Sequence, residues 1–111
     1  MAAFTCTLRC GIDEALRALE DAVLGGSVSA TREAAEELVS GGCRCAVRVY
    51  ERYSALGGNR VSLSLTLLGG GPCTELCAVA SGGSQALFFK INTFGEEAFL
   101  DCVRAAAERL C

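Results

Sequence analysis

Apolar and polar residues alternate at the start of the chain, which is the pattern of a strand with one buried face. The alternation predicts a first strand formed by Phe4, Cys6, Leu8 and Cys10 with the polar residues between them. From Ile12 the apolar spacing becomes helical and predicts an amphipathic helix of about 12 residues. Its apolar side holds Ile12, Leu16, Leu19 and Val23, and Gly25-Gly26 ends it.

The stretch from Cys43 to Asn92 predicts a meander of about four strands, separated by glycine-rich turns. In the first, Cys43, Cys45, Val47 and Val49 are expected to face the core, and Arg44, Ala46, Arg48, Tyr50 and Arg52 to face solvent. In the second, the core side is expected to hold Val61, Leu63, Leu65 and Leu67. A third run covers Cys73 to Ala80, and Leu87 to Asn92 alternates as a fourth.

The segments on either side of this meander have helical patterns. Arg32 to Val39 has the composition of a short helix, so we expect a helical turn there, with a strand as the alternative for residues 27–42. Thr93 and Glu96 form a capping box sequence. A closing helix is expected to follow, with an apolar stripe at Phe99, Val103, Ala106 and Leu110.

These elements predict a single α+β domain over residues 1–111. One antiparallel sheet of about five strands, with two helices packed on one face, accommodates every apolar stripe. The expected order is strand, helix, the uncertain segment at residues 27–42, four strands, helix.

Composition narrows the classes of function. The sequence is 51% apolar with a net charge of −3, so a folded protein is expected, and general nucleic-acid binding is disfavoured. No apolar run reaches the roughly 18 residues of a membrane helix, and the N-terminus lacks the pattern of a secretory signal. We therefore expect a cytoplasmic protein that neither enters a membrane nor requires a cofactor.

Eight cysteines are present and no histidine. None of the cysteines forms a CxxC pair, and reduced thiols in core positions act as small apolar residues. A thiol-based metal or redox site is the alternative, in which two neighbouring strands would bring together Cys6, Cys10, Cys43 and Cys45. Without histidine or a nucleophile–base pair, no catalytic site is predicted, and an enzyme is not expected.

A row of arginines gives the main candidate binding surface. Arg44, Arg48 and Arg52, with Tyr50 among them, are expected on the solvated face of one strand, where guanidinium groups suit phosphate or carboxylate recognition. A solubilising charged face is the simpler interpretation. The glycine-rich loop at Ser81-Gly82-Gly83-Ser84 leads into a predicted strand, so it is interpreted as a turn and not as a phosphate cradle.

Three segments resemble a family of small bacterial proteins, about 110 residues long, that form a domain of unknown function. These segments are VRVYERYS (47–54), GGNRVSLSLTLLG (57–69) and SGGSQALFFKINTFGEEAFL (81–100). The resemblance implies no activity, cofactor or site residues. The element order is also similar to TATA-binding-protein-like and helix-grip folds, a likeness that does not determine function.

We therefore expect a non-enzymatic domain that binds a partner protein or a small ligand. The surface would be the arginine row or a gap near Phe88, Phe89 and Phe94. Self-association is a further expectation, because some strands are predicted to leave an open edge or a lightly covered face.

Overall fold

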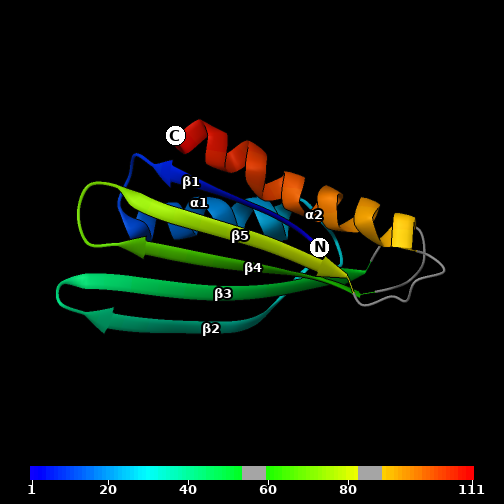
Figure 1. The fold of residues 1–111 in the computed structure, drawn as a ribbon, viewed down its shortest axis with the longest axis horizontal. Coiled ribbons are helices and arrows are strands. Elements are labelled where there is room, and N and C mark those ends of the chain that lie inside the picture. Colours follow the sequence, from blue (N-terminus) through cyan, green and yellow to red (C-terminus); the bar gives the residue numbers. More distant parts are fainter. Residues whose placement is uncertain (54–59, 83–88) are drawn as a thin grey trace.

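The computed structural model describes residues 1–53, 60–82 and 89–111. Seven elements follow in the order β1 (Ala2–Leu8), α1 (Ile12–Gly25), β2 (Thr31–Ser40), β3 (Cys43–Tyr53), β4 (Arg60–Gly69), β5 (Thr74–Gly82) and α2 (Phe89–Leu110). The five strands form one antiparallel sheet in the order β1-β5-β4-β3-β2, and both helices lie on one side of it (Figure 1). The predicted α+β class, with its sheet and helices, is confirmed.

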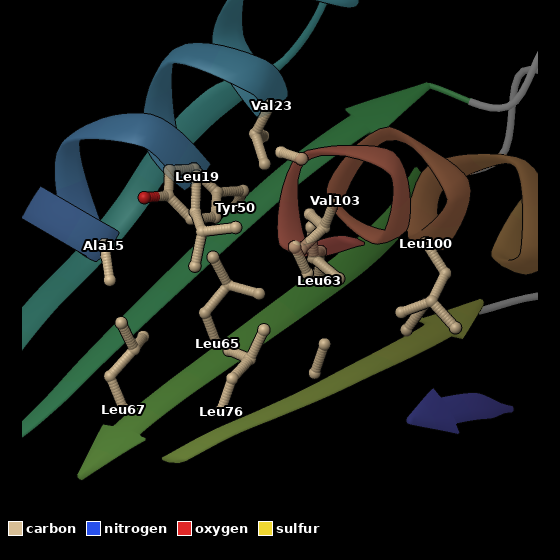
Figure 2. Close-up of a cluster of buried hydrophobic side chains, with 14 of the residues drawn as sticks. Ala15, Leu19, Val23, Tyr50, Leu63, Leu65, Leu67, Leu76, Leu100 and Val103 are labelled. Atoms are coloured by element: carbon tan, nitrogen blue, oxygen red, sulfur yellow. The ribbon is translucent and has the colours of Figure 1, made fainter. Parts of the chain in front are cut away.

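The core lies between the helices and the sheet. On β4 every second residue is buried, at Val61, Leu63, Leu65 and Leu67, which confirms the predicted period of two. Leu19 and Val23 of α1 and Leu100 and Val103 of α2 close over these side chains (Figure 2). Both helices therefore bury their apolar stripes against the same face of the sheet.

β2 replaces the helical turn predicted for residues 32–39, so that prediction is wrong. Gly41 and Gly42 have φ values of +56° and +85°, and positive φ at both central residues is what a two-residue hairpin with a type I′ turn requires. The hairpin pairs β2 with β3 along its length. β2 is exposed at all ten positions, so its sequence has no alternating apolar pattern. Its alanines and glutamates are common in helices, which is why the sequence predicted one.

The predicted fourth strand, Leu87 to Asn92, is also wrong from Phe89 onward, because α2 begins there. A short alternating apolar run cannot be distinguished from the first turn of a helix by periodicity alone. The expected count of five strands still holds, since β2 was missed and this run was wrongly included. Residues 83–88 and the side chains of residues 89–95 lie outside the described part, and with them the expected gap near Phe88, Phe89 and Phe94.

Glu96 has a different role from the capping box predicted with Thr93, because α2 already begins four residues before Thr93. Its buried carboxylate accepts a 2.6 Å hydrogen bond from the Gly82 N–H at the end of β5. It also pairs with the amino group of Met1. Glu96 thus joins α2 to the strands beneath it.

Candidate functional site

The arginine row lies on the helix side of the sheet, which corrects the prediction for β3. The register places Arg48 opposite Leu65, Tyr50 opposite Leu63 and Arg52 opposite Val61, and directly opposed residues share a face. Tyr50 is only 1% exposed and points into the core beside Leu19 (Figure 2). The valines and cysteines expected inside, Cys43, Cys45, Val47 and Val49, face the other way.

Carboxylates of α1 and β2 neutralise the first two arginines. Arg44 donates to Asp13 Oδ1 of α1 and to Glu37 Oε1 of β2, each at 3.0 Å. Arg48 donates to Glu37 Oε2 at 3.1 Å and to the carbonyl of Glu36 at 3.3 Å. The hydrogen bonds from Arg48 and Arg44 lower the pKa of the Glu37 carboxyl below its ordinary value. Arg44 and Arg48 therefore form a polar seam between α1, β2 and β3. Their charges are already paired within the protein.

Tyr50 and Glu20 extend this seam. The Tyr50 hydroxyl donates to Glu20 Oε2 at 2.7 Å, and Arg32 of β2 donates to both oxygens of the same carboxylate at 3.2 Å. Burial raises the pKa of the Tyr50 hydroxyl, and the hydrogen bond to Glu20 raises it further. The hydroxyl therefore stays protonated and acts as a donor.

Arg52 packs against α2. Its guanidinium lies 4.4 Å from the ring centroid of Phe99, a cation–π distance, and Nη1 donates to Cys102 Sγ at 3.7 Å. Of the four residues proposed as a binding face, Arg44, Tyr50 and Arg52 thus join the helices to β3, and Arg48 joins β3 to β2.

A hollow of about 220 Å³ remains between α1 and the β2–β3 hairpin. It is lined by Leu16, Arg17, Glu20, Asp21, Arg32 and Arg48. Arg32 and Arg48 already hold Glu20 and Glu37, so an anionic ligand would have to compete with these carboxylates. The hollow is consequently a weaker candidate for anion binding than the arginine row was in the sequence-based prediction.

The four cysteines of the alternative hypothesis are not brought together. Cys6 lies in β1 and Cys10 lies two residues after the end of that strand. Cys43 and Cys45 lie in β3, and β5 and β4 lie between β1 and β3. Two intervening strands separate the pairs by about 14 Å. Among the described residues no group of three or more Cys, Asp or Glu side chains could hold a metal ion.

The thiols differ in accessibility, and this predicts an order of alkylation. Cys43, Cys73 and Cys111 are exposed, and Cys10 is buried. Burial and a hydrogen bond with Cys111 raise the pKa of Cys6 to about 11, and burial also raises that of Cys10. Because the thiolate is the reactive form, iodoacetamide at pH 8 should label the three exposed thiols first and Cys6 and Cys10 last.

Peptide mass spectrometry of the alkylated protein would give this order, and labelling in guanidinium chloride, where all eight should react, is the control. Labelling of Cys10 as fast as Cys73 would contradict the placement of the two thiols.

The side of the sheet away from the helices is a surface that packing leaves unexplained; we call it the open face. β1, β5 and β4 contribute Ala3, Thr5, Thr7, Glu75, Cys77, Val79, Ser81, Ser62, Ser64, Thr66 and Leu68 to it, and β3 and β2 contribute Cys45, Val47, Val49, Glu51, Ala34, Glu36 and Leu38. Most of these side chains are small or apolar. Their charges are three glutamates, and Arg60 at the start of β4, opposite Tyr53, adds a positive charge at one end of this face. Neither described helix covers this face.

The outer edge of β2 is the second such surface. β2 is the last strand of the sheet and pairs only with β3 among the described strands (Figure 1). The sequence patterns predicted an open edge or a lightly covered face, but they did not indicate that β2 forms the edge or which side chains form the open face. The paired glycines before Cys43 were the available signal for β2, since two glycines between two runs of strand length are typical of a hairpin.

The fold defines a small α+β domain, with one antiparallel sheet covered on one face by two helices. Residues 1–111 match a family of unknown function, DUF6054, and the chain belongs to this family. No curated protein and no solved structure matches the chain. Neither described helix has the length and apolar character needed to span a membrane.

Proposed function

We propose that this protein is a non-enzymatic binding domain, and that β2 docks an extended segment of a partner protein. The observation that carries the proposal is the exposure of β2 at all ten positions on the outer edge of the sheet. The outward backbone N–H and C=O groups of an edge strand can pair with an added strand.

The side chains of β2 indicate the chemistry of the partner. Glu33, Glu36 and Glu37 outweigh Arg32, so the edge is acidic. Glu37 is held by Arg44 and Arg48, whereas Glu36 has no ion pair among the described residues and remains available. Leu38 and Val39 come after these glutamates in β2 and lie on opposite sides of the strand. Their side chains are 67% and 72% exposed.

A complementary segment would carry lysine or arginine opposite Glu36 and apolar residues opposite Leu38 and Val39. In antiparallel pairing the apolar residues would precede the basic ones. A second copy of β2 is disfavoured at this edge because the glutamates of the two strands would gather at one seam, and like charges across strands are destabilising.

A synthetic peptide tests this proposal. The probe is an acetylated, threonine-rich peptide. Its centre contains two adjacent valines followed by two lysines. Titrated into the ¹⁵N-labelled protein, it should shift the amide resonances of residues 31–40 saturably. Glu36→Lys should weaken binding about fivefold, because it replaces an attractive cross-strand pair with a repulsive one.

Glu108→Lys is the matched control, since Glu108 is an exposed glutamate on α2, away from the β2 edge, and binding should be unchanged. A peptide with glutamates in place of the lysines should bind less well to the native protein. Equal binding of the two peptides, or resonance shifts that fall outside β2, would refute the proposal.

A further inference from the structure

The residues of the open face form four rows, each made of side chains that stand opposite one another in the strand register. From the β2–β3 hairpin onward, the rows are Leu38-Cys45-Leu68-Glu75-Thr7, Glu36-Val47-Thr66-Cys77-Thr5, Ala34-Val49-Ser64-Val79-Ala3 and Thr31-Glu51-Ser62-Ser81. β4 supplies the middle residue of the complete rows, because it is the third of the five strands.

We propose that the open face packs against the open face of a second copy of this chain, with the two-fold axis parallel to β4. An axis in this position exchanges the two sides of the sheet. β4 then lies over β4 of the second copy, with both strands pointing the same way, β3 faces β5, and β2 faces β1. Two sheets stacked in this way form an aligned sandwich about 10 Å thick, in which the mean strand directions of the two sheets differ by less than about 30°.

The side chains along the axis are self-complementary. Leu68, 49% exposed in the single chain, meets Leu68 of the second copy, and Thr66 meets Thr66. On either side, Val47 faces Cys77 and Val49 faces Val79. The two-fold therefore places apolar residues of β3 on apolar residues of β5, as an isologous interface requires.

A depression in the open face fits this arrangement. It has a volume of about 300 Å³ and is lined by Thr5, Thr66, Leu68, Glu75, Leu76 and Cys77. The two-fold brings Leu38 of the second copy over Thr7, at the rim of this depression. Leu38 is 67% exposed in the single chain, and packing at the depression would cover it.

The charges and the size of the open face permit this contact. Glu36 falls over Thr5 and Glu75 over Cys45, so no glutamate faces another. Arg60, at the start of β4, falls near Arg60 of the second copy, and each of them is ion-paired with its own Glu33 and Glu51. Five strands and four rows cover about 600 Å² per copy, and about 1,200 Å² in total is the lower limit of a stable interface. The outward backbone groups of β2 stay free in the dimer. Glu36 and Leu38 take part in both proposed contacts, so a monomeric variant is needed to separate the two proposals.

Charge variants at Thr66 test the axis directly. The wild-type protein should sediment as a dimer that dissociates on dilution. Thr66→Lys and Thr66→Glu should each raise the dissociation constant about a hundredfold or more, because two like charges would meet on the axis. An equimolar mixture of the two variants should recover the dimer, because opposite charges then face each other.

Val39→Lys is the control, since Val39 is exposed on the helix side of β2, and it should leave the dimer intact. Circular dichroism melting of each variant would establish that it is folded. A wild-type monomer at every concentration, a mixture that stays monomeric, or a Val39→Lys variant that dissociates would overturn the inference. Peptide binding to the monomeric Thr66→Lys variant should persist, which separates the two proposals experimentally.

Discussion

Tyr50→Ala should lower the free energy of unfolding by about 3–5 kcal/mol, the range for removing a large buried aromatic side chain. The Tyr50 side chain is almost wholly buried between α1 and the sheet, and its hydroxyl donates to Glu20. The substitution would leave a cavity and deprive the Glu20 carboxylate of a donor. Urea denaturation followed by circular dichroism measures this loss.

Val49→Ala is the matched control, because Val49 is the neighbour of Tyr50 on β3 and lies on the open face. Measured at a dilution where the protein is monomeric, it should cost less than about 1 kcal/mol, as expected for a site outside the core. A larger loss for Val49→Ala than for Tyr50→Ala would show that β3 faces the opposite way.

Glu96→Ala should destabilise the protein by about 2–3 kcal/mol, the second-largest effect we expect. Glu96 is only 4% exposed, and its loss would leave the Gly82 N–H without its carboxylate acceptor. Hydrogen bonds to charged groups contribute about 1.5–3 kcal/mol, and an unsatisfied buried donor has a similar cost. Thermal and urea unfolding would both report the loss.

The control is Glu97→Ala, at the next position of α2. Glu97 is exposed and lies 3.8 Å from Arg104, and exposed ion pairs contribute about 0–1 kcal/mol. Equal effects of the two substitutions would show that Glu96 does not join α2 to β5.

The two proposed surfaces have different roles. β2 offers backbone groups and an acidic edge to a partner segment, whereas the open face offers mostly small or apolar side chains to a second copy. Stacked open faces would leave both β2 edges exposed at the sides of the sandwich. A dimer of this kind would therefore present two docking strands, and a partner with two suitable segments would bind with increased avidity.

The sequence by itself determined the strands and helices that have a buried side. α1, β4 and the later part of α2 were predicted with their buried residues, because each presents one apolar stripe to the core and that stripe has the period of its secondary structure. The fold class followed from these stripes, since one sheet face and two helical stripes can bury one another.

Only the tertiary structure decided which side of β3 is buried and that residues 31–40 form a strand. Along β3 both alternating sets contain apolar residues, and the choice between them depends on the register with β4 and on the carboxylates that α1 and β2 provide for the arginines. β2 has no buried side, so its sequence carries no period, and its strand conformation comes from hydrogen bonding to β3. The sequence predicted an open edge or a lightly covered face but not its location, because an exposed edge and an uncovered face are defined by the elements that do not pack against them.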